Sequence, residues 1–143
     1  MWQFDFKGHF AMQNGKRCYP LTVPDDCSRY NICTDVKENE RYIGVKESFE
    51  RIFELYGLPD TALYDNGNPW GTQYSVGYTV FEDWLMDLVI LTKHGRPNHL
   101  QTQGKDERFN GTLKKELLKH RQIKDIVDAQ REFDEFRLFY NNE

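Results

Sequence analysis

Three strand-like segments, separated only by short turns, open the chain. They cover residues 2–10, 17–23 and 29–36, and the first alternates aromatic with polar side chains. The stretches between them carry the turn signals Gln13-Asn14-Gly15 and Asp25-Asp26-Cys27-Ser28. Connections this short join antiparallel neighbours, because parallel strands need a much longer crossover. The N-terminal quarter of the chain is therefore predicted to form an antiparallel meander.

Helical and strand-like patterns then alternate. Residues 40–56 have apolar side chains at helical spacing, and Gly57-Leu58-Pro59 ends the pattern. The apolar face of this helix consists of Val45, Phe49, Ile52, Phe53 and Tyr56. Later segments are a strand at 61–65, a helix at 79–88, a strand at 89–92, and helices at 104–120 and 123–140. This order predicts one α/β domain with a mixed five-stranded sheet flanked by helices.

Size and composition fit a single globular domain. The chain has 143 residues, of which 38% are hydrophobic and 15% aromatic, which argues against disorder. No apolar run reaches the length of a membrane span, and the N-terminus has no signal-peptide pattern. The three cysteines lack the spacing of a disulfide framework or a zinc site; they are Cys18, Cys27 and Cys33. We expect a cytoplasmic, bacterial protein that does not enter a membrane.

Positive charge is concentrated in one part of the sequence. The chain has a formal net charge of −4, but residues 93–121 contain eight Lys and Arg against three Asp and Glu. Such a segment is often only a solvated helix face. Here it begins with a Gly- and Pro-containing polar loop at 94–104 and contains the acid Glu107. That coincidence favours contact with a phosphate backbone.

Three acids on separate elements are candidates for one metal site: Asp5 in the first strand, Asp65 at the end of a short strand, and Glu107 at the start of a helix. Each has a simpler explanation, respectively a solvent-facing strand residue, a turn former and a favourable charge at a helix N-terminus. Taken together with the basic segment, they indicate a divalent-metal site. Mg²⁺ prefers carboxylate oxygens, and two ions about 3.5–4 Å apart can act on a phosphodiester.

Other polar and aromatic residues are given structural interpretations. We interpret Asp25 and Asp26 as turn formers, and Trp2, Trp70 and Trp84 as packing residues. The histidines show no metal-ligand spacing; His94 and His99 flank the basic loop and are interpreted as solvated loop residues, although DNA contact stays an alternative for both. Candidates for contacts with the phosphate backbone are Lys105, Arg108, Lys114 and Lys115.

Four motifs give the chain a resemblance to a known superfamily. They are Trp2-Gln3-Phe4-Asp5-Phe6-Lys7-Gly8, the segment 21–29, Asp65-Asn66-Gly67, and the segment from Arg96-Pro97 through Gln101-Thr102-Gln103-Gly104-Lys105-Asp106-Glu107-Arg108-Phe109 to Lys114. The chain resembles the catalytic cores of integrases and transposases that use an Asp-Asp-Glu triad, specifically bacterial insertion-sequence transposases and their retroviral integrase relatives. The resemblance implies a ribonuclease H-like fold, bound Mg²⁺ or Mn²⁺, and attack of a DNA 3′-hydroxyl on a target phosphodiester.

The resemblance also assigns roles to residues. It makes Asp5, Asp65 and Glu107 the three catalytic acids and metal ligands, although 41 residues separate Asp65 from Glu107 against about thirty-five in the retroviral type. It implies that the partners are DNA and further copies of the chain, with at least a dimer in the active complex. Residues 1–143 are expected to be a catalytic core excised from a longer protein with an N-terminal DNA-binding region. Alternatives are a nuclease without joining activity, or a non-catalytic module for DNA binding or oligomerisation.

Overall fold

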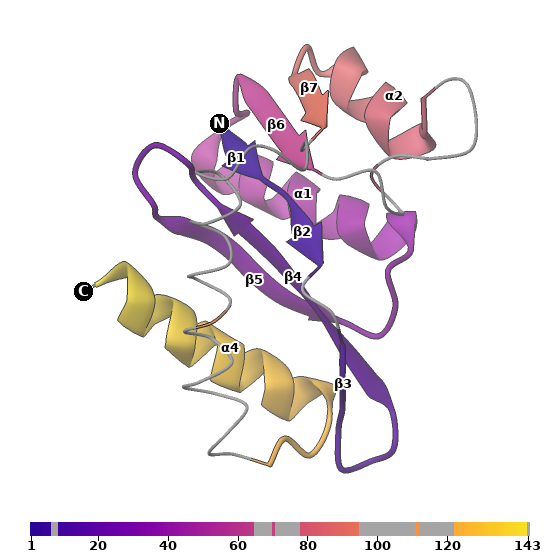
Figure 1. Cartoon of the computed structure of the whole chain (residues 1–143), viewed down its shortest axis with the longest axis vertical. Coiled ribbons are helices and arrows are strands. Elements are labelled where there is room, and N and C mark those ends of the chain that lie inside the picture. The colour runs from indigo at the N-terminus through magenta and orange to yellow at the C-terminus, as the bar shows by residue number, and fades with distance from the viewer. Residues whose placement is uncertain (7–8, 65–69, 71–77, 95–110, 112–121, 143) are drawn as a thin grey trace.

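The computed structural model describes residues 1–6, 9–64, 70, 78–94, 111 and 122–142. Its helices and strands, shown in Figure 1, are β1 (Trp2–Gln3), β2 (Asp5–Phe6), β3 (Phe10–Ala11), β4 (Arg17–Pro24), β5 (Asn31–Lys37), α1 (Tyr42–Tyr56), β6 (Thr61–Tyr64), α2 (Val80–Asp87), β7 (Leu91–His94) and α4 (Ile126–Asn141). Of the helix predicted at 104–120 only Gly111 is described, and it is helical. None of the described helices has the length and apolar composition needed to cross a membrane.

Both parallel and antiparallel pairing occur, as the mixed sheet requires. β2, β3 and β5 pair antiparallel with β4, and β1, β6 and β7 pair parallel in that order. The two sets meet at Phe4, which lies between β1 and β2 and whose N–H donates to the carbonyl of Leu63 at 2.8 Å. The first strand of the chain therefore spans from the antiparallel meander to the parallel strands.

The count of five strands is not confirmed. The described residues contain seven strand segments, because the strand predicted over 2–10 is divided into β1, β2 and β3. Phe6 pairs with Leu21 whereas Phe10 pairs with Cys18, so the register against β4 changes between β2 and β3. The alternation of aromatic and polar residues did not reveal this change, because register depends on the partner strand as well.

The last predicted strand is also displaced along the sequence. It was expected at 89–92 but runs from Leu91 to His94, where it pairs with Thr61–Tyr64. Val89 instead lies just after α2 with a φ of 61°, and it is 89% exposed. A short apolar run does not define which of its residues pair, so the parallel partner β6 decides the register.

The main core lies between the sheet and the helices α1 and α2. Aromatic rings fill its centre: the Phe4 and Phe49 ring centroids are 4.3 Å apart, and Trp70 lies 5.0 Å from Phe81. Three of the five residues predicted for the apolar face of α1 are fully buried, and Phe53 packs against the core. Tyr56 is an exception at 43% exposure, because its hydroxyl accepts a hydrogen bond of 2.7 Å from Arg137.

Helix α4 covers the opposite face of β4 and β5. Leu21 and Cys33 belong to the main core, whereas Cys18 and Val36, which alternate with them along the strands, pack against α4 in a second cluster. Figure 1 shows α1 and α4 on either side of the β4–β5 ladder. The helix begins at Ile126 because the Asp125 side chain accepts a hydrogen bond from the N–H of Asp128. The domain therefore has three layers.

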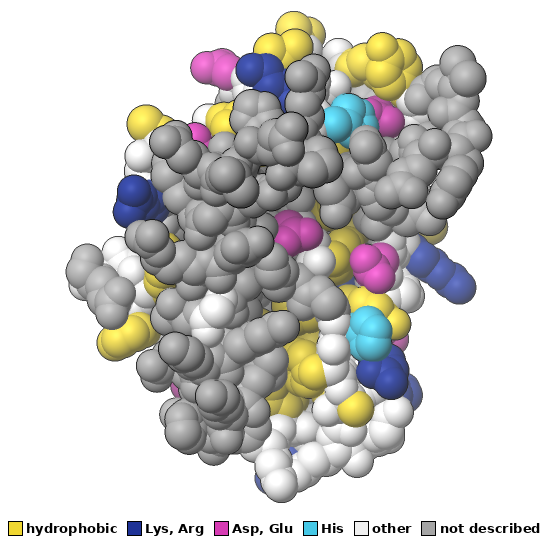
Figure 2. Space-filling model, in the orientation of Figure 1, with side chains coloured by type: hydrophobic (Ala, Val, Ile, Leu, Met, Phe, Trp, Pro, Cys, Tyr) yellow, Lys and Arg dark blue, Asp and Glu magenta, His cyan; other side chains and the backbone are white. Residues whose placement is uncertain are grey.

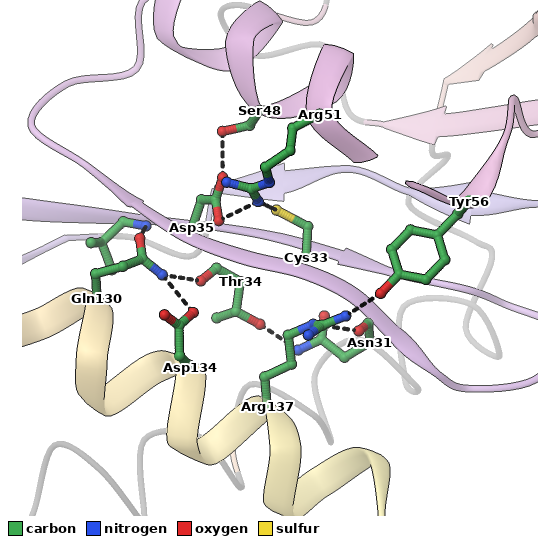
Figure 3. A network of polar contacts seen from close by, with 11 residues as sticks. Asn31, Cys33, Thr34, Asp35, Ser48, Arg51, Tyr56, Gln130, Asp134 and Arg137 are labelled. Carbon is green, nitrogen blue, oxygen red and sulfur yellow. Dashed lines mark hydrogen bonds and ion pairs between the residues drawn. The ribbon is translucent and has the colours of Figure 1, made fainter. Parts of the chain in front are cut away.

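A polar network joins α1, β5 and α4 across the edge of the sheet (Figure 3). Asp35 of β5 receives hydrogen bonds from Ser48 and Arg51 of α1, at 2.5 and 2.7 Å. From α4, Gln130 donates to the carbonyl of Thr34 at 3.0 Å. Buried carboxylates are costly unless they are paired in this way, so the network ties both helices to β5.

Candidate active site

Asp5 lies in β2 and is half-buried. Its neighbours Phe4 and Phe6 pack into the main core, so the Asp5 side chain projects from the opposite face of the sheet. It pairs with Thr22 of β4, whose hydroxyl donates to the Asp5 carbonyl at 3.4 Å. Pairing strands rather than a loop therefore hold this carboxylate, as a precisely placed ligand requires.

The residues that precede Asp5 and Asp65 lie side by side. β1 and β6 run parallel, with Trp2 opposite Ala62 and Gln3 opposite Leu63. The Phe4 and Tyr64 rings then stack, with centroids 6.2 Å apart and planes at 15°. Phe4 is bonded directly to Asp5, and Tyr64 is bonded directly to Asp65.

Most of the predicted site lies outside the described residues. This applies to Asp65 and Glu107, and to the four basic candidates Lys105, Arg108, Lys114 and Lys115. Within the described part of the chain, no group of three His, Cys, Asp or Glu residues is placed to hold a metal ion. The site assignments therefore stay predictions, with Asp5 as the one acid of the triad that is placed.

A buried carboxylate that the sequence reasoning missed lies close to this region. Glu82 of α2 is 2% exposed, and its Oε2 accepts a hydrogen bond of 2.8 Å from the Tyr64 hydroxyl. His94 at the end of β7 places Nε2 3.0 Å from the same oxygen, and Oε1 accepts from the N–H of Thr79 at 3.1 Å. Burial and the neighbouring carboxylate raise the pKa of the Tyr64 hydroxyl, which keeps it protonated as a donor.

His94 is exposed, as its interpretation as a solvated residue predicts, but it lies at the end of a strand rather than in a loop. Its ring meets the Tyr64 ring edge-on at 5.0 Å and also contacts Glu82. The sequence does carry one signal for Glu82, since Thr79 and Glu82 have the spacing of a capping box, which the structure confirms. That signal explains only its role at the start of α2.

The interpretations of Asp25 as a turn former and of the three tryptophans as packing residues are confirmed. The Asp25 carboxylate accepts hydrogen bonds from the backbone and the hydroxyl of Ser28 within a turn. Burial opposes its ionisation, but these hydrogen bonds outweigh burial and hold the pKa of Asp25 below its usual range. Asp26 accepts from Gln3 at 2.9 Å. All three tryptophans pack in or against the main core: Trp2, Trp70 and Trp84.

Comparison with known proteins identifies the family. The family model described as Integrase core domain matches residues 1–99, and a second model with the same description matches residues 88–143. The Pol polyprotein of Feline endogenous virus ECE1 is 29% identical over an alignment of 123 residues, and the match covers 82% of this chain and 11% of the polyprotein. The chain thus corresponds to a small part of that relative.

Solved structures of viral integrases share the fold. A chain of the simian T-cell lymphotropic virus intasome, in complex with PP2A regulatory subunit B56 gamma, matches with a TM-score of 0.65 and 25% identity over 83% of this chain and 40% of its own length. The HTLV-2 integrase catalytic core domain in complex with magnesium matches with a TM-score of 0.62 and 22% identity, covering 83% and 69%. The BIV integrase core gives 0.64 and 20%, covering 92% and 78%.

These neighbours confirm the ribonuclease H-like α/β fold that the motifs implied. The two family models together reach from residue 1 to residue 143, whereas the matches to these structures cover 83% to 92% of the chain. The chain therefore belongs to the integrase core domain family and is related to retroviral integrases.

Proposed function

We propose that the chain is the catalytic core of a DNA transposase or integrase of the insertion-sequence type, which cuts DNA and joins the ends to a target. The observation that carries this proposal is the stacking of Phe4 on Tyr64 at the paired ends of β1 and β6. The next residue along the sequence from each ring is an acid, Asp5 or Asp65, and adjacent Cα atoms are about 3.8 Å apart across a peptide bond. This adjacency supports the proposal that Asp5 and Asp65 act at one site.

The donor set fits a divalent cation. Three carboxylates are hard oxygen ligands of the kind that Mg²⁺ and Mn²⁺ prefer, and Asp5 is held on paired strands. In this proposal Asp5, Asp65 and Glu107 hold the metal, which when bound would activate the attacking oxygen and stabilise the leaving one. The HTLV-2 core, a structural relative, is in complex with magnesium. No Ser, Tyr or Cys nucleophile is required.

The distribution of charge supports separate roles for the acidic side chains, which would bind metal, and the basic side chains, which would contact DNA. Figure 2 shows acidic side chains near the middle of one face and others near its upper edge, while the described Lys and Arg side chains on that face lie nearer its rim. The basic segment 93–121 supplies the positive charge that the DNA backbone would need. Lys105, Arg108, Lys114 and Lys115 are proposed to contact phosphates and to orient the DNA without reading its sequence.

Assembly with a second copy of the chain is part of the same proposal. The HTLV-2 core is known in trimeric and dimeric forms. We propose at least a dimer in the active complex with DNA. Sedimentation of the protein with DNA tests this, and a complex that contains a single copy of the chain at high concentration would contradict it.

A strand-transfer assay tests the catalytic proposal. Labelled DNA with a free 3′-hydroxyl is incubated with Mg²⁺ and wild type, Asp5→Asn, Asp65→Asn or Asp26→Asn. Removing a metal ligand should lower joining by at least about 100-fold, because even supporting residues of metal sites cost about 10–100-fold. Asp26→Asn, which alters an acid outside the triad, should retain activity.

The other outcomes distinguish the alternatives. Metal-dependent cleavage by the wild type without any joined product would indicate a nuclease. DNA binding that persists in all four proteins, without metal-dependent chemistry in any, would indicate a non-catalytic module. Full activity of Asp5→Asn or Asp65→Asn would refute the assigned triad.

A further inference from the structure

We infer that Glu82 is a positioning residue for the second catalytic acid, acting on Asp65 through the Tyr64 hydroxyl. The inference rests on the proposed function, since it takes Asp65 as a metal ligand. Its starting point is the contact of 2.8 Å between the Tyr64 hydroxyl and a carboxylate that is 2% exposed. Because Glu82 would touch neither metal nor DNA, its effect on the site would be indirect.

The two oxygens of Glu82 have separate partners. Oε1 accepts from the backbone N–H of Thr79, which completes the capping box of α2. Helix capping needs no more than that. Oε2 is left for the Tyr64 hydroxyl and the His94 ring, which lie at the C-terminal ends of β6 and β7. The second oxygen therefore contacts side chains at the ends of two strands. These contacts are not needed to cap helix α2.

Tyr64 is restrained at both ends of its side chain. Its ring contacts Phe4, Trp70 and Phe81, with centroids between 6.1 and 6.3 Å away. Its hydroxyl donates to Glu82, so the outer end of the ring is held as well as its faces. The backbone at Tyr64 is one peptide bond from Asp65, and metal ligands need placement within about 0.5 Å. Losing the hydroxyl should therefore loosen the ligand more than the fold.

His94 extends the same restraint to the third strand. It is the last described residue of β7, and the polar loop expected at 94–104 starts at this position. Its contact with Glu82 spans 12 residues of sequence, and that of Tyr64 spans 18. Glu82 therefore joins α2 to the ends of β6 and β7. In the sequence, β6 is followed by Asp65, and β7 ends in the basic segment.

The experiment compares Tyr64→Phe with a matched control, Ser48→Ala. Each variant removes one hydroxyl that donates to a buried carboxylate, Glu82 at 2.8 Å or Asp35 at 2.5 Å. Ser48 and Asp35 lie in the network between α1 and β5 (Figure 3), and β5 pairs with β4 rather than with β1 or β6. Mn²⁺ affinity is measured by electron paramagnetic resonance of the free ion, with the protein bound to a DNA duplex, and thermal unfolding is recorded for each protein.

We expect Tyr64→Phe to bind Mn²⁺ about tenfold more weakly than the wild type, the lower end of what supporting residues of metal sites cost. DNA affinity should be unchanged, and Ser48→Ala should bind Mn²⁺ as the wild type does. Glu82→Gln keeps the size of the side chain and, if it folds, should weaken Mn²⁺ binding at least as much as Tyr64→Phe.

Each remaining outcome has a definite meaning. Wild-type Mn²⁺ binding that Asp65→Asn abolishes, together with unaltered binding by Tyr64→Phe, would overturn the inference and leave the proposed function standing. Equal weakening by Tyr64→Phe and Ser48→Ala would also overturn it, because a general loss of stability would then explain both. Wild-type binding that Asp65→Asn does not change would overturn the proposed function and the inference with it.

Discussion

Replacing Arg51 by Met should destabilise the fold at neutral pH, and the loss should disappear in acid. Arg51 donates to Oδ1 of Asp35 at 2.7 Å, while Ser48 occupies the other carboxylate oxygen (Figure 3). Asp35 is only 6% exposed, so removal of the guanidinium leaves a buried carboxylate with one fewer charged donor. Methionine retains much of the apolar stem of Arg, which keeps changes in packing small.

The magnitude follows from this geometry. A hydrogen bond to a charged group contributes about 1.5–3 kcal/mol to the free energy of unfolding. The Arg51 side chain is 54% exposed, so solvent screening places the pair near the lower end, about 1.5 kcal/mol. Burial alone would raise the pKa of Asp35, but hydrogen bonds from Arg51 and Ser48 and the charge of Arg51 outweigh burial, and the pKa lies below its usual value.

The direction of the pH dependence follows from that lowered pKa. A carboxyl with a lower pKa in the folded than in the unfolded state stabilises the fold above the unfolded value, about 3.9 for Asp. This stabilisation is lost as the pH falls through the folded-state pKa of Asp35. The difference between wild type and Arg51→Met should therefore be complete at pH 7 and shrink below about pH 4.

Urea unfolding at neutral and at acidic pH measures the effect, with Asp35→Asn and the double variant completing a cycle. The Arg51→Met change should cost far less in the Asp35→Asn background, because the charge that it neutralises is already gone. An equal loss at both pH values, or an equal loss in both backgrounds, would refute the reasoning and assign the role of Arg51 to packing.

Two further substitutions test the core and the helix cap near the site. Trp70→Ala should lower the free energy of unfolding by about 3–5 kcal/mol, since Trp70 is 1% exposed, and Trp70→Phe should cost clearly less in the same urea titration; equal costs would contradict close packing around the indole. Thr79→Ala should cost about 1 kcal/mol in thermal unfolding, because it removes the cap hydroxyl that accepts from the N–H of Glu82 at 3.1 Å, whereas Thr79→Ser should retain most of the stability.

Much of the fold was predictable because its elements carry local signals. The amphipathic face of α1 and the turns around β4 follow from spacing and turn residues that act within a few positions. What the sequence did not provide was register, as the division of the first strand and the displacement of β7 show. Register is decided by a partner strand far along the chain, so no local pattern contains it. The Arg137 hydrogen bond that keeps Tyr56 at the surface is likewise a contact across 81 residues.

The candidate site was predictable only in part, for a related reason. Asp5 could be singled out because an acid between two aromatic residues of a strand is uncommon. Glu82 could not, because its spacing from Thr79 is fully explained by helix capping. Its contacts with Tyr64 and His94 come from two other elements, and only the folded chain brings them together.

The hydrogen bonds that a carboxylate accepts from the protein distinguish the structural acids of this domain. Asp25, Asp35 and Glu82 each accept several hydrogen bonds from protein donors, so their lone pairs are committed to the fold. These three acids therefore have structural roles that their positions in the sequence do not show. Counting acids in the sequence cannot identify these roles, because the donors Ser48 of α1 and Tyr64 of β6 meet Asp35 and Glu82 only in the folded chain. Asp35 thereby joins α1 to β5 and Glu82 joins α2 to β6, while Asp5 pairs with β4, so the structural acids support the frame on which the proposed catalytic acids depend.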